Sequence, residues 1–251
     1  MKKIAVILLM MTLGYFLFIN LYATSAGNLN FPKYGETNLK NRVSDKYIKK
    51  DVKGTENETI YGQNGLESGA ANVVTSIVVD YRSFDTLGEV TVLFISALGV
   101  SLVMGISNKR KRFTIPSNFI LKQGARIIYS IILVTGVYMF IHGHLTPGGG
   151  FPGGSMIASS FLLMYIADED FKLKFKYLKV TEGIAGSAYV LIGLLGMLIG
   201  GYFLINILPT GSVGSLFSAG IIPIVYTLIG LKVGAELTGI IGNFLSEEVE
   251  K

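Results

Sequence analysis

The chain contains no cysteine and only two histidines among its 251 residues. Without thiolates it can form neither a disulfide nor an iron–sulfur cluster of its own. Two histidines are too few for a dedicated histidine-based metal site. We therefore expect no metal, no cofactor and no catalytic centre in this chain, and we assign any redox chemistry to a partner.

Charge is also scarce. Charged residues make up 16% of the chain, hydrophobic residues make up 50%, and the mean hydropathy is +0.53. An ordinary soluble domain carries roughly 25% charged residues. The 31 glycines, many of them inside apolar runs, suit the close approach of packed transmembrane helices. This composition excludes a soluble enzyme and predicts an all-α integral membrane protein.

Apolar stretches predict about six transmembrane helices, because about 20 residues are needed to cross a bilayer. The expected spans cover residues 4–22, 90–106, 127–141, 155–167, 189–208 and 221–245. The fourth is long enough only if the glycine-rich turn before it enters the protein interior. The first could instead be a cleaved signal peptide, since Lys2 and Lys3 precede it and residues 24–26 are small. Its apolar run exceeds the 7- to 15-residue apolar region of a usual signal peptide, which favours an uncleaved anchor.

The basic residues predict the topology, because short cytoplasmic loops carry an excess of lysine and arginine. Three basic clusters fall on one side of the expected spans: Lys2 and Lys3, residues 109–112, and the lysines within residues 172–179. The loops after His144 and over residues 209–220 lack lysine and arginine. We therefore expect cytoplasmic termini and an outer, solvated connector over residues 27–68. The net charge of +5 indicates anchoring to an anionic membrane surface and no role in nucleic-acid binding.

Residues 72–89 are predicted to form a short amphipathic helix ahead of the second span, since apolar side chains recur there at helical spacing. At about thirteen residues it is too short to span, so it would lie at the interface or re-enter the membrane. Its charged residues are Asp80, Arg82, Asp85 and Glu89. They are either solvated surface groups or part of an ion entrance at the mouth of a span.

Residues 142–154 form a motif rich in glycine and proline. It contains His142, His144, Pro147, Gly148, Gly149, Gly150, Pro152, Gly153 and Gly154. Glycines permit positive φ and close backbone approach, whereas prolines restrict the chain. No lysine–serine pair follows, which excludes a phosphate-binding P-loop. The motif is either a tight hairpin between two spans or a place where one histidine relays protons near neutral pH.

Lys232 and Glu236 stand near the middle of the last expected span. A lysine at that depth costs about 2.5 to 3.5 kcal/mol on the insertion scale, so both charges need partners. They share a helix face at i and i+4, while a stripe of small residues occupies the other side: Gly230, Gly234, Thr238 and Gly242. The pair is either a structural lock to a neighbouring helix or a group that moves H⁺ or Na⁺.

Two segments resemble known membrane proteins. Residues 72–104, with Val-Asp-Tyr-Arg-Ser-Phe-Asp-Thr-Leu-Gly-Glu, resemble the C-terminal part of MrpA, the large subunit of Mrp-type Na⁺/H⁺ antiporters, and the equivalent small subunit of membrane-bound hydrogenases. Residues 119–245, with the glycine–proline motif, resemble the MnhB/MrpB family of antiporter subunits. The expected domains are therefore an anchor (1–26), a connector (27–68), an MrpA-like part (69–107), an MnhB-like part (117–245) and a tail (246–251).

The presence of both pieces in one polypeptide resembles the energy-converting branch, in which a sodium module is joined to a membrane-bound hydrogenase or a related ferredoxin-dependent complex. This resemblance implies a protein that helps couple H⁺ and Na⁺ movement. The implied partners are other antiporter-like membrane subunits and, in that branch, hydrogenase and iron–sulfur subunits. The alternatives are a purely structural role in the same complex and membership of a stand-alone Mrp antiporter. An autonomous transporter is disfavoured because no inverted repeat is visible.

Overall fold

The fold is described from a computed structural model, which covers residues 66–104, 110–112 and 117–248 together with a few positions nearer the N-terminus. The chain divides into two compact units, residues 1–45 and residues 46–251. In the first unit, residues 8, 10–16, 18 and 19 are described and are helical. The other residues of the expected first span at 4–22 lie outside the described part of the chain, and so does the expected connector at 27–68 except for residues 46, 47, 61, 62, 64 and 66–68.

Five long helices make up most of the second unit. They are α4 (Ser83–Val103), α5 (Phe119–Ile141), α6 (Gly150–Ala167), α7 (Phe175–Gly200) and α8 (Ile222–Phe244), and each is long and apolar enough to cross a membrane. A short α3 (Val73–Thr75) and the π-helix η1 (Ser76–Tyr81) precede α4. Two short strands, β1 (Arg110–Arg112) and β2 (Ser246–Glu248), pair antiparallel. The predicted helical membrane fold is confirmed.

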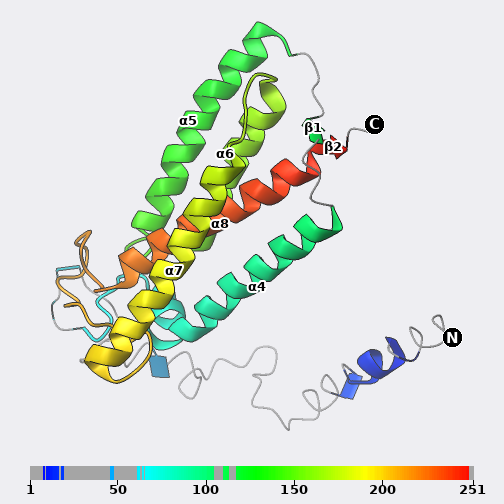
Figure 1. Ribbon diagram of the computed structural model, residues 1–251. Coiled ribbons are helices and arrows are strands. Elements are labelled where there is room, and N and C mark those ends of the chain that lie inside the picture. The colour runs from blue at the N-terminus through cyan, green and yellow to red at the C-terminus, as the bar shows by residue number, and fades with distance from the viewer. Residues whose placement is uncertain are drawn as a thin grey trace. The chain divides into compact units, whose positions relative to one another are not determined.

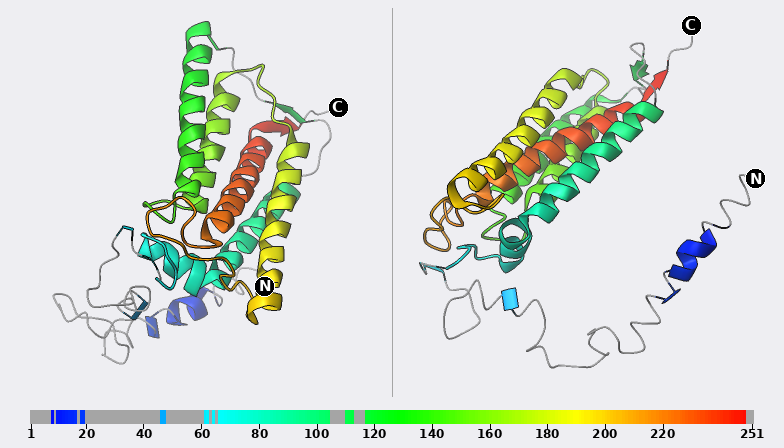
Figure 2. Two further views of the ribbon diagram at one scale, coloured as in Figure 1. Left: turned by 90° about the vertical axis from the view of Figure 1, so that its left-hand side faces the viewer. Right: turned by 60° about the horizontal axis from the view of Figure 1, so that its bottom comes forward.

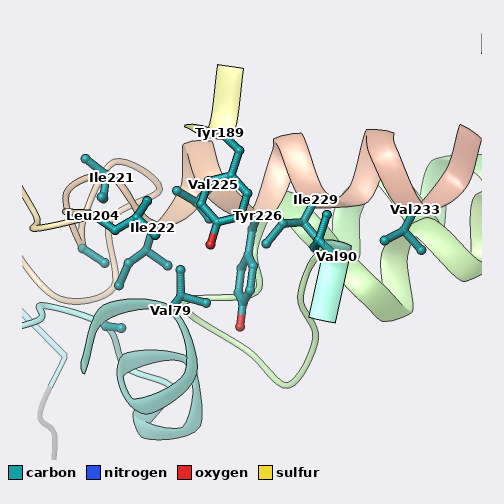
Figure 3. Close-up of a cluster of buried hydrophobic side chains, with 12 residues drawn as sticks. Val79, Val90, Tyr189, Leu204, Ile221, Ile222, Val225, Tyr226, Ile229 and Val233 are labelled. Atoms are coloured by element: carbon teal, nitrogen blue, oxygen red, sulfur yellow. The ribbon is translucent and has the colours of Figure 1, made fainter. Parts of the chain in front are cut away.

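Helix α8 is the centre of this unit. It packs against α4, α5, α6 and α7 (Figure 1), and views from two other directions show the same arrangement (Figure 2). Figure 3 shows the apolar core at one end of α8, where Val79 of η1, Val90 of α4 and Tyr189 of α7 meet side chains of α8. Because α8 is enclosed by other helices, any charge on its buried faces must find a protein partner.

The glycines of α5, α6 and α8 allow these helices to approach closely. A Cβ atom on Gly153 would lie 2.7 Å from the carbonyl oxygen of Gly136 in α5, and one on Gly154 would lie 2.8 Å from that of Gly230 in α8. Both distances are shorter than real side chains tolerate. The expected backbone approach at the glycine-rich motif is therefore present, and it joins α6 to a neighbour on each side.

The expected amphipathic helix over residues 72–89 is wrong in its extent. The helical segment ends at Tyr81, where the N–H of Arg82 donates to the carbonyl of Ile77 at 2.9 Å in π-helical spacing. The chain bends at Arg82 (φ −128°, ψ 35°), and α4 begins at Ser83 instead of residue 90. Asp85 and Glu89 therefore belong to the first two turns of a span and not to a separate interfacial helix.

The expected fifth span is present, but its predicted bounds of 189–208 are wrong. Helix α7 covers Phe175–Gly200 and ends where Gly201 takes a φ of +79°. The apolar residues that follow fold back along α7: Phe203 packs at Gly193, and the N–H of Leu204 donates to the Gly193 carbonyl at 3.3 Å. Apolar sequence beyond residue 200 therefore covers α7 instead of lengthening it.

Helices α5 and α6 start earlier than expected, whereas α8 is close to its expected range. Helix α5 begins at Phe119, where Asn118 accepts a hydrogen bond from the N–H of Leu121 at 2.8 Å and caps the helix. Helix α6 begins at Gly150, so the second half of the glycine-rich motif forms its first turn. Helix α8 differs from the expected range by one residue at each end.

Charged side chains join the start of α5 to the end of α6. Arg126 donates to Asp168 at 2.8 Å, and Lys122 lies 2.8 Å from Glu169. The hydrogen bond from Arg126 lowers the pKa of the Asp168 carboxyl below its ordinary value. Ser117 donates to the carbonyl of Ala167 at 2.7 Å. These contacts hold together the end of the helices opposite the glycine-rich turn.

Candidate ion-translocation site

The glycine-rich turn lies over the start of α8 and is held by α3. Asn72 donates from its side chain to the carbonyls of Gly143 and Thr146, both at 3.1 Å. Thr75 donates to the Gly143 carbonyl at 2.8 Å and shares a hydrogen bond with the Tyr226 hydroxyl at 3.1 Å. The turn thus links α3 to α8 through buried hydrogen bonds.

Within the motif, the glycines make the tightest contacts. Gly149 has a φ of +141°, and a Cβ atom there would lie 3.1 Å from the ring of Tyr226. A Cβ atom on Gly148 would lie 2.8 Å from the Met139 carbonyl, and one on Gly150 would lie 2.5 Å from Ile229. Pro147 and Pro152 are exposed. The motif is a hairpin followed by the first turn of α6.

The two histidines of the motif contact different groups. The His142 ring stacks on Tyr138, with 4.1 Å between the ring centroids. His144 is completely buried, and its Nε2 lies 3.4 Å from the carbonyl of Ser215. Burial lowers the pKa of His144 below the ordinary value of 6.5. Its Nδ1 finds no hydrogen-bond partner among the described residues.

Lys232 and Glu236 form an ion pair on α8 in the interior of the helix bundle. The Glu236 side chain is 0% exposed and that of Lys232 is 10% exposed. The Lys232 ammonium also lies 4.8 Å from the centre of the Phe94 ring of α4, within cation–π range. The second carboxylate oxygen of Glu236, Oε2, has no hydrogen-bond partner in the described part of the chain.

A groove of about 270 Å³ leads to this pair between α4 and α7. Both helices pack on α8, which forms its floor. Phe94 lies on the α4 wall, and Glu182, Gly186 and Ser187 lie on the α7 wall. Lys232 is the residue of α8 that lines it. At Gly186, the absence of a side chain leaves room for the Lys232 methylenes, which would lie 3.3 Å from a Cβ atom there.

Ionisable groups occur at different depths in and beside this groove. At 1.5 Å per residue, Glu89 stands about 9 Å from the start of α4, and Lys232 stands about 15 Å from the start of α8. Glu182 stands about 10 Å from the start of α7, which runs antiparallel to α8. Tyr189 of α7 also lines the groove and donates its hydroxyl to the Ser83 carbonyl at 3.2 Å. Glu89, Lys232, Glu236 and Glu182 are together called the polar row.

The remaining predicted residues lie outside the groove. Arg82 and Asp85 form an exposed ion pair where α4 begins, and Asp80 is half-buried on η1. Sequence reasoning did not single out Glu182 or Tyr189. Glu182 falls in the loop before the expected fifth span, and no local signal marks it, because it lies in the charged first turns of α7, four residues before Gly186.

The five long apolar helices define a multi-pass membrane protein. Residues 120–239 match the family model of a domain related to the MnhB subunit of Na⁺/H⁺ antiporters. Residues 42–117 match the MbhE family model, which describes one of the subunits of MBH.

Known proteins resemble both parts. The chain is 42% identical to a chain of the membrane-bound sulfane sulfur reductase, an archaeal respiratory membrane complex, and the match covers 98% of this chain and 99% of that one with a TM-score of 0.73. An uncharacterized protein of Methanocaldococcus jannaschii is 34% identical over 66% of this chain and 74% of its own length. A chain of the Mrp complex from a Dietzia species shares the fold, at 23% identity and a TM-score of 0.57, over 71% of this chain and 21% of that one.

The chain therefore belongs to the MnhB family of antiporter subunits, with a segment of the MbhE type ahead of the MnhB domain. It is a membrane subunit of an Mrp-type antiporter module.

Proposed function

We propose that this chain helps carry H⁺ or Na⁺ through an energy-converting respiratory complex, along the row formed by Glu89, Lys232, Glu236 and Glu182. Similarity to a chain of the sulfane sulfur reductase and to the MbhE family supports a complex of the hydrogenase-related kind. In this proposal, hydrogenase-like or iron–sulfur subunits supply the redox chemistry, and this chain has no catalytic centre. H⁺ and Na⁺ are its transported ions, and both termini are cytoplasmic.

The observation that carries the proposal is the buried pair on α8 beside an open groove. Burying an ion pair within a membrane span costs free energy. A carboxylate oxygen without a hydrogen-bond partner among the described residues, here Oε2 of Glu236, adds to that cost. Such an arrangement fits a group that exchanges partners, because Oε2 of Glu236, which has no hydrogen-bond partner within the described part of the chain, can accept a proton or contact a cation. Glu182 in the groove wall offers a second carboxylate near the pair.

The competing role is structural. Lys232 is satisfied by Glu236 and by the Phe94 ring, so the pair could simply fasten α8 to α4. Truncating one partner of a buried ion pair costs about 3 to 5 kcal/mol, whereas replacing both with apolar residues of similar volume is often nearly neutral. Single and double variants therefore separate the two roles.

The experiment compares assembly with Na⁺/H⁺ exchange in membrane vesicles. Lys232→Met or Glu236→Gln alone should lower the yield of intact complex. The apolar double variant Lys232→Met with Glu236→Met should assemble like the wild type and yet lose most of the exchange, since no titratable group remains at this position. Leu231→Met, on the exposed side of α8, is the control and should change neither quantity. Normal exchange by a fully assembled double variant would show that the pair is structural.

A further inference from the structure

Small residues line the groove between α4 and α7 along its α7 wall. Gly183, Gly186 and Ser187 follow one another there, and Thr91 lines the groove from α4. A Cβ atom on Gly183 would meet nothing within 4 Å. A wall of small side chains with open space above it lets another helix approach with its backbone close to α7.

The carboxylates make this groove unsuitable for lipid tails. Glu182 lines it, and Glu89 is exposed on α4 directly before the lining residues Val90 and Thr91. Ionisable side chains within a membrane span face protein or water, because contact with hydrocarbon costs several kcal/mol. The positive charge of Lys232 is paired with Glu236. The groove and its rim therefore have more negative than positive charge.

We propose that the groove is the docking surface for a transmembrane helix of a neighbouring protein in the complex. That helix presents small residues to α7 and one basic side chain to Glu182. Charge complementarity selects this occupant, since Lys232, the lysine that lines the groove, is paired with Glu236, whereas Glu182 lines the groove and Glu89 lies at its rim. The docked helix closes the groove toward the lipid and leaves the polar row beneath it. The inference needs only the membrane location and not transport by this row.

Photo-crosslinking in the purified, assembled complex tests the docking surface. Val190 lines the groove and is 41% exposed, while the adjacent Leu191 is 57% exposed and does not line it. A benzophenone amino acid at Val190 should crosslink to one other protein of the complex, within an apolar span that carries a lysine or arginine. The same probe at Leu191 should give less than about a tenth of that adduct.

A second measurement concerns the charge of Glu182. The crosslink identifies the partner protein, and its retention is then measured in complexes that carry no crosslinker. Glu182→Gln should reduce the amount of this partner that stays bound through detergent purification by about tenfold, which corresponds to about 1.4 kcal/mol. Asp170→Asn, whose side chain is 84% exposed in the turn after α6, should leave retention unchanged.

Three outcomes would overturn the proposal: an adduct at Val190 only with lipid, an adduct with this chain's own N-terminal segment, or equal adducts at both positions. None of these outcomes depends on Na⁺/H⁺ exchange, so failure here is distinct from failure of the proposed transport role.

Discussion

At the scale of single residues, the buried polar groups differ in how well they are satisfied. Thr75 makes two hydrogen bonds, one to the Gly143 carbonyl and one shared with Tyr226. His144 and Glu236 each keep one buried polar atom without a partner among the described residues. Such groups are costly. At His144 and Glu236, a change of protonation therefore changes the free energy of unfolding most directly.

His144 makes a pH-dependent contribution to stability. Burial lowers the pKa of its imidazole in the folded protein below the ordinary 6.5. Below about pH 6.5 the unfolded chain binds a proton that the folded chain excludes, so stability falls as the pH drops toward the folded pKa. We expect the melting temperature of the complex to decrease from about pH 7.5 to about pH 5.5, and His144→Asn to remove part of that decrease.

The matched control is His142→Asn, since His142 lies on the same turn with its ring stacked on Tyr138. Its pH dependence should follow the wild type. If His144→Asn keeps the full pH dependence while His142→Asn loses it, the role assigned to His144 is wrong.

At the scale of helices, the contact between α5, α6 and α8 depends on glycine. Gly136 and Gly153 face one another across α5 and α6, and Gly154 faces Gly230 across α6 and α8. Because backbone approaches backbone there, no rotamer change can make room for a side chain. The spacing of these helices, and with it the position of α8, is fixed by residues without side chains.

Gly153→Val should therefore disturb assembly more than transport. The added Cβ would lie 2.7 Å from the Gly136 carbonyl, and overpacking of this kind costs typically about 1 to 3 kcal/mol. Gly149→Val should act in the same way, because its φ of +141° disfavours any side chain. The yield of intact complex in blue native electrophoresis measures both effects.

Gly239→Val is the control, since a Cβ atom at that position of α8 meets nothing within 4 Å. Normal assembly of the Gly153 variant, with only its ion affinity changed, would contradict a structural role for the glycine-rich motif.

Several helix boundaries could not be obtained from apolar runs alone. The range of α8 was predicted to within one residue at each end because its apolar stretch coincides with the helix. The range of α7 was missed because its first turns carry Lys176, Lys179 and Glu182, while the apolar residues after Gly201 fold back on the helix. Hydropathy measures burial in any apolar environment and does not separate a span from a segment packed against one.

The site shows the same difference between local and long-range information. The spacing of Lys232 and Glu236 within one helix predicted their common face, and the structure pairs them. The groove depends on α4 and α7 both packing on α8, which no local pattern encodes. Glu182 and Tyr189 join the site only through that packing.

At the scale of the whole molecule, the polar row is useful only if water or ions can reach it. The groove opens between α4 and α7, and the proposed partner helix would separate it from lipid without filling its polar floor. If the groove contains no water, Lys232 and Glu236 only stabilise the packing of α8 on α4. If it contains water, the water can link the pair to Glu89 and Glu182.

Cysteine accessibility in the assembled complex tests this most directly, because the chain contains no native cysteine. Thr91→Cys places a thiol on the α4 wall of the groove, opposite the α7 wall on which the partner helix is proposed to dock, and Ser96→Cys places one on the exposed side of α4 away from the groove. A small, permanently charged thiol reagent reacts in water and not in hydrocarbon. We predict that Thr91→Cys reacts at least about tenfold faster than Ser96→Cys and that modification blocks Na⁺/H⁺ exchange. An unreactive Thr91→Cys, or full exchange after its modification, would contradict a hydrated polar row.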